Sequence, residues 1–183
     1  MHLSAPPRFA VIALAAGALV SLPACGQVKR PDGGQGLLPV GALAPDVEGR
    51  DPSGATVRLS EVRGNPAVVY FYPKDGTPGC TTEACAFRDA FKGYEAKHIV
   101  VFGVSHDSSD SHAKFAAHHS LPFPLVSDED GKVARAYGVS NFLGMDSRVT
   151  FLVGPDGKVA RVWPNVDPGV HADQVLSAAA QVQ

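Results

Sequence analysis

Two runs of apolar residues with one amphipathic segment between them constrain the fold of this chain most. Residues 67–72 (AVVYFY) and 99–104 (IVVFGV) are continuously apolar, which is typical of strands buried on both faces. The segment between them, residues 80–97, has apolar side chains at spacings of three and four, the period of a helix. These side chains are Ala84, Phe87, Phe91 and Tyr94. The order strand, helix, strand predicts a right-handed crossover between two parallel strands.

The remaining patterns predict a second half that is partly antiparallel. A hairpin is expected around the turn at residues 51–54, and another around Gly154-Pro155-Asp156-Gly157. Further elements are expected as helices at 110–119, 132–137 and 171–181, and as strands at 125–127, 149–153 and 158–163. A βαβ half followed by a ββα half resembles a thioredoxin-like fold. We therefore expect one α/β domain over residues 37–183, with a central mixed β-sheet flanked by helices.

Composition excludes several classes of function. The chain has 183 residues and a formal net charge of −2, which gives no support to nucleic-acid binding. The seven histidines form no metal-binding pattern, so the sequence implies no metal or other cofactor. Three cysteines, Cys25, Cys80 and Cys85, are too few for a disulfide-stapled miniprotein.

The first 24 residues predict a secretory signal peptide. Arg8 precedes the apolar run 9–20, which is too short for a comfortable membrane span. Leu22-Pro23-Ala24-Cys25 resembles the lipobox of bacterial lipoproteins, so Cys25 is expected to carry a lipid and anchor an exported protein to a cell-envelope membrane. Simple cleavage after Ala24 and a buried N-terminal helix are the alternatives. Residues 26–36 are rich in Gly and polar residues and predict a flexible tether.

The loop at residues 73–79 predicts a reactive thiol. It leads from a buried strand to a helix that begins near Cys80. Helix N-termini leave backbone N–H groups unpaired, and their partial positive charge favours the thiolate, which is the nucleophilic form. We therefore expect Cys80 to attack the substrate.

Cys85 is expected to be the redox partner of Cys80. In one regular helix their Cα atoms would lie about 8.6 Å apart, whereas a disulfide needs roughly 4.4–6.8 Å. Bond formation would therefore require local unwinding of the helix.

Three functions compete for this cysteine pair. A disulfide oxidoreductase favours Cys-x-x-Cys, but four residues separate this pair. A copper-binding protein would use Cys-x3-Cys with a distant histidine such as His171, but a histidine there more often faces solvent. A thiol peroxidase would need hydrogen-bond donors around the thiolate, which Thr77 and Arg148 can supply. A fourth, non-enzymatic possibility is a lipid-tethered redox sensor or binding module, which would share the features of the peroxidase and differ only in slow re-reduction.

A longer motif favours the thiol peroxidase over the disulfide oxidoreductase and the copper-binding protein. Pro73-x3-Thr77-x2-Cys80 resembles the active-site motif of peroxiredoxins, and residues 71–89 (FYPKDGTPGCTTEACAFRD) are similar to the bacterioferritin-comigratory, or peroxiredoxin Q, subfamily. Shorter matches occur at residues 44–46, 103–105 and 148–152.

The resemblance implies a thioredoxin-dependent peroxidase for hydrogen peroxide and organic hydroperoxides. It assigns Cys80 as the peroxidatic cysteine and Cys85 as the resolving one, with Pro73, Thr77 and Arg148 as the pocket. The cycle would pass through a Cys80 sulfenic acid and a Cys80–Cys85 disulfide, which a thioredoxin-like dithiol would reduce. Because the disulfide is intramolecular, a monomer is expected.

Overall fold

The computed structural model describes Met1 and residues 27–182. The predicted signal peptide, apart from Met1, and the predicted lipidation site Cys25 lie outside the described residues. Among residues 27–182, none of the helices combines the length and apolar character needed to cross a bilayer.

The strand β3 (Ala67–Phe71) lies in the middle of the molecule. All five of its side chains are buried, as its continuous apolar run predicts. It pairs in parallel with β4 (Val100–Ser105) and antiparallel with β8 (Val149–Val153). The predicted parallel pairing of the two buried strands is confirmed.

The main sheet has seven strands in the order β2-β1-β5-β4-β3-β8-β9. It is mixed, since only the β3–β4 and β4–β5 pairs are parallel. The remaining strands of this sheet are β1 (Glu48–Arg50), β2 (Thr56–Arg58), β5 (Leu125–Ser127) and β9 (Val159–Trp163), of which β2 and β9 form its edges. A separate small hairpin is formed by β6 (Asn141–Phe142) and β7 (Met145–Asp146).

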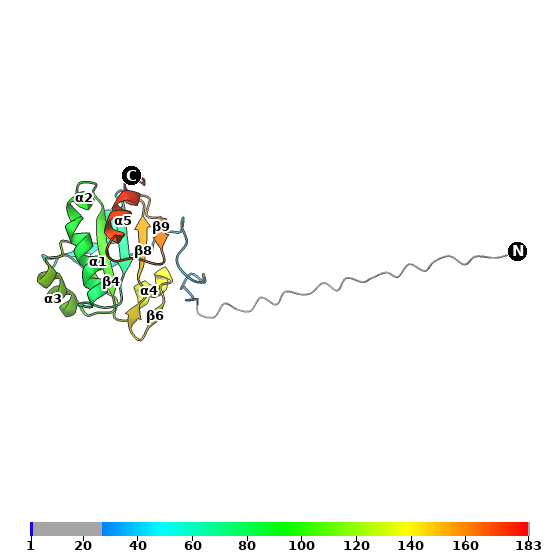
Figure 1. Ribbon diagram of the computed structural model, residues 1–183, viewed down its shortest axis with the longest axis horizontal. Helices are drawn as coiled ribbons and strands as arrows, with labels where there is room; N and C mark the ends of the chain where they lie inside the picture. Colours follow the sequence, from blue (N-terminus) through cyan, green and yellow to red (C-terminus); the bar gives the residue numbers. More distant parts are fainter. Residues whose placement is uncertain (2–26, 183) are drawn as a thin grey trace.

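Helices cover both faces of this sheet (Figure 1). One face packs against α1 (Pro78–Asp89), α2 (Phe91–Glu95), α3 (Ser109–His119) and α5 (His171–Ala179). The other face packs against α4 (Lys132–Tyr137), the short 3₁₀ helix η1 (Leu59–Val62) and residues near Leu38. The fold is the α/β sandwich that the sequence predicts.

The structure divides the predicted helix over residues 80–97 into α1 and α2. The chain turns at Ala90, whose carbonyl accepts a hydrogen bond from Gly93. A side chain on Gly93 would lie 2.7 Å from Leu176 of α5. Glycine therefore lets α5 pack closely against α2 and also weakens the helix at this point.

Residues 27–36 form a closed turn rather than the irregular tether that their composition predicts. Lys29 and Gln35 pair as an isolated antiparallel bridge. The Arg30 guanidinium is buried and donates hydrogen bonds to the carbonyls of Gly36 and Leu37, at 2.8 and 3.1 Å. These bonds satisfy backbone groups that an extended linker would leave to water.

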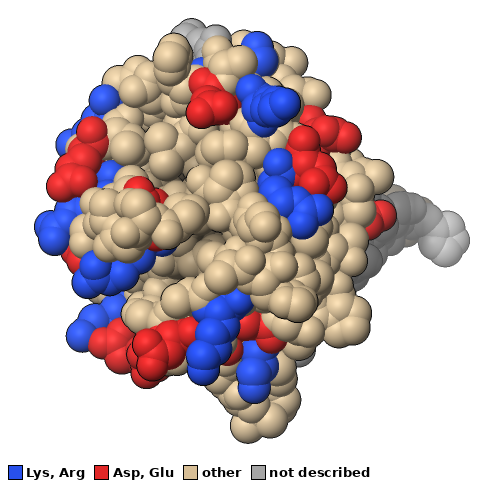
Figure 2. All heavy atoms as spheres, turned by 90° about the vertical axis from the view of Figure 1, so that its left-hand side faces the viewer, with Lys and Arg blue, Asp and Glu red and all other residues tan. Residues whose placement is uncertain are grey.

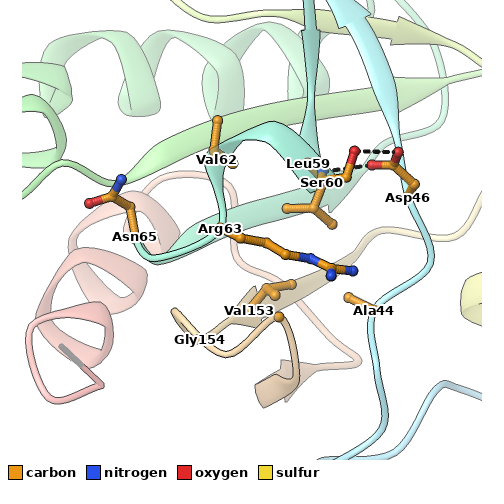
Figure 3. A pocket seen from close by; sticks show the side chains of 10 residues that line it. Ala44, Asp46, Leu59, Ser60, Val62, Arg63, Asn65, Val153 and Gly154 are labelled. Carbon is orange, nitrogen blue, oxygen red and sulfur yellow. Dashed lines mark hydrogen bonds between the residues drawn. The ribbon is translucent and has the colours of Figure 1, made fainter.

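Asp46 connects the N-terminal segment to η1. Its carboxylate accepts hydrogen bonds from the backbone N–H and the hydroxyl of Ser60, at 2.8 and 2.7 Å (Figure 3). The pocket beside this contact has a volume of about 10 Å³, which is about the space of one water molecule. Asp46 is therefore a structural residue, and the pocket is too small for an organic substrate.

Candidate active site

The loop between β3 and α1 places Cys80 in the first turn of a helix. Thr77 is the N-cap, Pro78 is the first helical residue, and the Thr81 N–H donates to the Thr77 carbonyl at 2.9 Å. Pro78 has no N–H, so helix geometry leaves the N–H groups of Gly79 and Cys80 without a partner inside the helix. Unpaired N–H groups at a helix N-terminus carry partial positive charge, which is the basis for the sequence prediction of a thiolate at Cys80.

Cys80 is almost fully buried and contacts Arg148. The Arg148 Nη2 atom donates a hydrogen bond to Cys80 Sγ at 3.4 Å, and only 1% of the cysteine is exposed. Arg148 reaches the sulfur because Val149, the next residue, pairs with Phe71 at the end of β3. The structure therefore brings together the two residues that the sequence places far apart in the chain.

Glu83 is a member of this site that the sequence analysis missed. Its buried carboxylate forms a salt bridge with Arg148 Nη1, while Arg148 Nη2 contacts the thiol. Burial raises the pKa of Glu83 to about 7, although Arg148 acts in the opposite direction. The signal was its spacing of three residues from Cys80, which puts both side chains on one face of α1.

Gly79 gives Arg148 the room to make these contacts. A side chain at position 79 would lie 3.3 Å from Arg148 Nη2, which is tighter than most side-chain contacts. Glycine between Pro78 and Cys80 therefore serves the approach of the guanidinium as well as the turn into α1.

Thr77 and Pro73 both lie on the loop that leads to Cys80, and both are partly buried. The Thr77 hydroxyl donates to the carbonyl of Lys74 at 3.0 Å. Its oxygen therefore offers lone pairs to a bound ligand, whereas the sequence analysis expected it to offer a proton. Pro73 directly follows Tyr72 and begins the loop.

Asp75 anchors the same loop to α3. Its carboxylate accepts hydrogen bonds from Tyr72 at 2.8 Å, from Ser111 at 2.8 Å and from His112 Nδ1 at 2.9 Å. Burial acts to raise the pKa of Asp75, but the hydrogen bonds from His112, Ser111 and Tyr72 hold it below its usual value. The Asp75 N–H also donates to Asp107 at 2.8 Å. The loop is thus fixed at a point two residues before Thr77.

Cys85 lies on α1 with Cys80, and both thiols are free. Because both residues belong to one regular helix, the separation of about 8.6 Å between their Cα atoms applies. A disulfide between them requires the backbone of α1 to unwind first.

His171 does not face solvent, so the expectation for it is wrong. It is fully buried, and its Nε2 atom lies 2.8 Å from the Thr150 hydroxyl. Burial lowers the pKa of His171 to about 4, so its ring is neutral. In the described part of the chain, no three His, Cys, Asp or Glu side chains are grouped so that they could hold a metal ion.

The face that carries α2 and α3 has acidic and basic side chains interspersed around uncharged, hollowed surface (Figure 2). A hollow of about 620 Å³ lies between α3 and the β1–β2 hairpin. Cys80, Thr77 and Arg148 do not line it. The reactive site therefore lies outside this hollow.

A buried thiol that contacts a guanidinium at a helix N-terminus is suited to nucleophilic attack on a small polar substrate. Residues 40–162 match the model of the AhpC/TSA family. The chain belongs to this family. Its AhpC/TSA relatives include the peroxiredoxin Bcp of Bacillus subtilis (strain 168), which is 40% identical over 147 residues, covering 76% of this chain and 93% of that protein.

Solved structures of AhpC/TSA proteins agree with this membership. Peroxidoxin BcpB from Mycobacterium tuberculosis is 36% identical, with a TM-score of 0.71, over 79% of this chain and 97% of the other. The bacterioferritin comigratory protein of Xanthomonas campestris, described as reducing alkyl peroxides, is 37% identical. Its TM-score is 0.67, over 75% of this chain and 92% of the other. The predicted peroxiredoxin fold and the predicted family are both confirmed.

Proposed function

We propose that this chain is a thiol-dependent peroxidase that reduces hydrogen peroxide and organic hydroperoxides with Cys80 as its nucleophile. The observation that carries the proposal is the hydrogen bond from Arg148 to the buried Cys80 sulfur at 3.4 Å. A cysteine kept only for packing needs no cation beside it. Here the cation stabilises the thiolate and lies where the leaving oxygen develops charge.

In the first step, the Cys80 thiolate attacks one peroxide oxygen. An S–O bond forms, the O–O bond breaks, and the second oxygen leaves as hydroxide or alkoxide and takes up a proton. The Arg148 guanidinium and the free N–H groups of Gly79 and Cys80 stabilise that oxygen. The Thr77 oxygen accepts a hydrogen bond from the peroxide. Cys80 becomes a sulfenic acid.

In the second step, the N-terminal part of α1 unwinds and Cys85 condenses with the sulfenic acid. A disulfide forms and water is released. A thioredoxin-like dithiol protein then reduces the disulfide by exchange, which returns both thiols.

Substitution of each cysteine tests this cycle. Cys80→Ser abolishes peroxide consumption in the presence of a dithiol protein donor. Cys85→Ser consumes about one equivalent of peroxide per chain and then stops until a small thiol is added. Steady turnover in the Cys80 variant, or normal cycling of the Cys85 variant with the protein donor, contradicts the proposal. Very slow re-reduction of wild type would instead favour a redox sensor.

We also propose that the enzyme is exported and held at a membrane by a lipid on Cys25. The support is the sequence of residues 8–25, with its basic start, short apolar run and lipobox-like end. Labelling cells with a fatty-acid analogue should mark the wild-type chain and leave Cys25→Ser unmarked. An unlabelled wild-type chain that begins at Cys25 would instead indicate simple cleavage.

The proposed intramolecular disulfide also favours a monomer, because neither half-reaction needs a second subunit. Sedimentation of the chain without residues 1–25 tests this state.

A further inference from the structure

Cys85 lies beside two side chains that the proposed cycle has not used. Its Sγ atom is 3.9 Å from Nδ1 of His119, the last residue of α3, which is contact distance for a thiol and an imidazole. Arg88, one helical turn after Cys85, donates from Nη1 to the His119 carbonyl at 2.9 Å. The thiol, the imidazole and the guanidinium therefore meet where α1 and α3 pack together.

The charge state of His119 suits it to accept a proton. Burial lowers the pKa of His119, and the neighbouring His118 and Arg88 lower it further, so the ring is neutral at neutral pH. The titratable and charged groups that face the ring are Cys85 and Arg88 from α1 and His118 from α3. Phe115 packs against it edge to face, with ring centroids 4.9 Å apart. With its proton on Nε2, the imidazole presents the Nδ1 lone pair to the sulfur.

Arg88 completes the group by stabilising a negative sulfur. Its pKa is raised, first by a hydrogen bond to Asp89 and also by the nearby Cys85 thiol. Asp89 binds the Nε and Nη2 atoms, and the His119 carbonyl binds Nη1. The guanidinium is therefore held in place beside Cys85 rather than free in solvent.

We propose that His119 is the general base for the resolving step of the cycle, an inference that rests on the proposed function of Cys85. His119 Nδ1 takes the proton from the Cys85 thiol, and Arg88 stabilises the thiolate. The thiolate attacks Sγ of the Cys80 sulfenic acid. The S–S bond forms, the S–O bond breaks, and the departing hydroxide takes a proton to become water.

The order of events follows from the contact itself. His119 touches Cys85 while α1 is folded, so the proton moves before the helix unwinds. The hydrogen bond from Arg88 to the His119 carbonyl holds the C-terminal part of α1 against α3 during unwinding. Cys85 thus leaves its folded position already activated.

The test compares His119→Gln with His118→Gln in the same chain. The single tryptophan, Trp163, belongs to the same buried hydrophobic cluster as Cys80 and Ala84 of α1, so its fluorescence can report unwinding of the turns that contain them. Rapid mixing with peroxide gives a first phase for attack and a second phase for disulfide formation. We expect His119→Gln to slow the second phase at pH 7 at least tenfold. The first phase should remain unchanged in both variants, and His118→Gln, which keeps the His119 imidazole, should retain most of the wild-type rate of the second phase.

Two readouts separate a base from a packing residue. Without the imidazole, the second phase should rise about tenfold per pH unit across the neutral range, because solvent hydroxide must take the proton. If disulfide formation is slower in His119→Gln, a second peroxide should convert its Cys80 sulfenic acid to the sulfinic acid at a lower peroxide concentration than in wild type. A residue that only packs α3 against α1 would, when replaced, loosen α1 and speed the second phase.

Two different results would overturn the role of His119 and the resolving role of Cys85. An unchanged or faster second phase with a wild-type pH profile in His119→Gln overturns the role of His119 and leaves the peroxidase proposal intact. A wild-type chain that shows no second phase, with a trace that Cys85→Ser does not alter, overturns the resolving role of Cys85 and the inference with it.

Discussion

The Arg148 guanidinium faces two acceptors, the Cys80 sulfur on Nη2 and the Glu83 carboxylate on Nη1. Both acceptors project from α1, three residues apart, and Arg148 directly precedes β8. A planar fork of donors can serve two such partners at once, whereas an ammonium group offers one centre of charge. The donor to the thiolate is therefore fixed before any peroxide arrives.

Replacing Arg148 by Lys should slow the attack of Cys80 on peroxide about 100-fold, because one ammonium cannot hold Glu83 and the sulfur together. The rate of the first fluorescence phase after mixing with peroxide measures this. If Arg148→Lys reacts with peroxide within a factor of three of the wild-type rate, the two-donor geometry of the guanidinium is not needed for attack.

Glu83 should make the stability of the fold depend on pH. The usual pKa of 4.5 applies to the unfolded chain, and burial raises it to about 7 in the folded chain. Between these values the folded state holds a proton that the unfolded state releases. The free energy of unfolding should thus be highest below pH 4.5 for this group and fall by roughly 2–3 kcal/mol as pH rises to 7.

Urea unfolding of wild type and Glu83→Gln at pH 5 and pH 8 tests this dependence. Glutamine keeps the shape and cannot ionise, so its variant should lack this part of the decline. Equal declines in both proteins would mean that Glu83 does not bind a proton near neutral pH.

The sequence could predict the roles of Cys80 and Arg148, whereas for Glu83 it offered only the helical spacing from Cys80 and no sign of burial. A cysteine after a Pro/Gly-rich loop and an arginine before a strand carry local signals, and strand order brings them together. The burial of Glu83 and its salt bridge with Arg148 depend on tertiary packing around α1, which no local pattern records. His119 was missed for the same reason, since its neighbour Cys85 belongs to another helix.

At the scale of elements, α1 must satisfy opposing demands. It must be folded to place Cys80 beside Arg148 and Cys85 beside His119, and it must unwind to bring the two sulfurs together. The loop before it is fixed by Asp75, and its C-terminal part is fixed by Arg88. Unwinding is therefore expected between these points, in the turns that contain both cysteines.

Thr82→Gly and Thr82→Ala form a matched pair that tests this expectation. Thr82 is exposed, lies between the two cysteines, and loses the same hydroxyl in both variants. Glycine destabilises a helix by about 1 kcal/mol relative to alanine. Disulfide formation should therefore be about fivefold faster in the Gly variant, with equal rates of peroxide attack. Equal rates of disulfide formation would place the slow step outside the unwinding of α1.

Element boundaries followed from the sequence wherever periodicity was strong and turns were conventional. The strand β8 and the helix α4 match their expected ranges. The β6–β7 hairpin was missed because its turn uses Leu143, with a φ of 53°, before Gly144. A leucine in the left-handed region is unusual, so composition gives no warning of such a turn.

At the scale of the whole molecule, α5 holds α2 and the C-terminal part of α1 in place while the first turns of α1 unwind. Tyr94 donates to the Ala172 carbonyl at 2.5 Å, and Phe87 packs on His171 of α5. Both contacts lie beyond Cys85 in the chain. These contacts therefore remain intact while the first turns of α1 open, so a large rearrangement of the domain is not required.

The central claim, that Cys80 and Cys85 form an intramolecular disulfide at the expense of the helix, can be tested on one peptide. Trypsin releases residues 75–88, which contain both cysteines, by cutting after Lys74 and Arg88. After one equivalent of peroxide, mass spectrometry without reductant should find this peptide lighter by two hydrogen masses than in the reduced protein. A peptide with oxygen retained on Cys80 and a free Cys85, or a peptide of unchanged mass, would contradict the account.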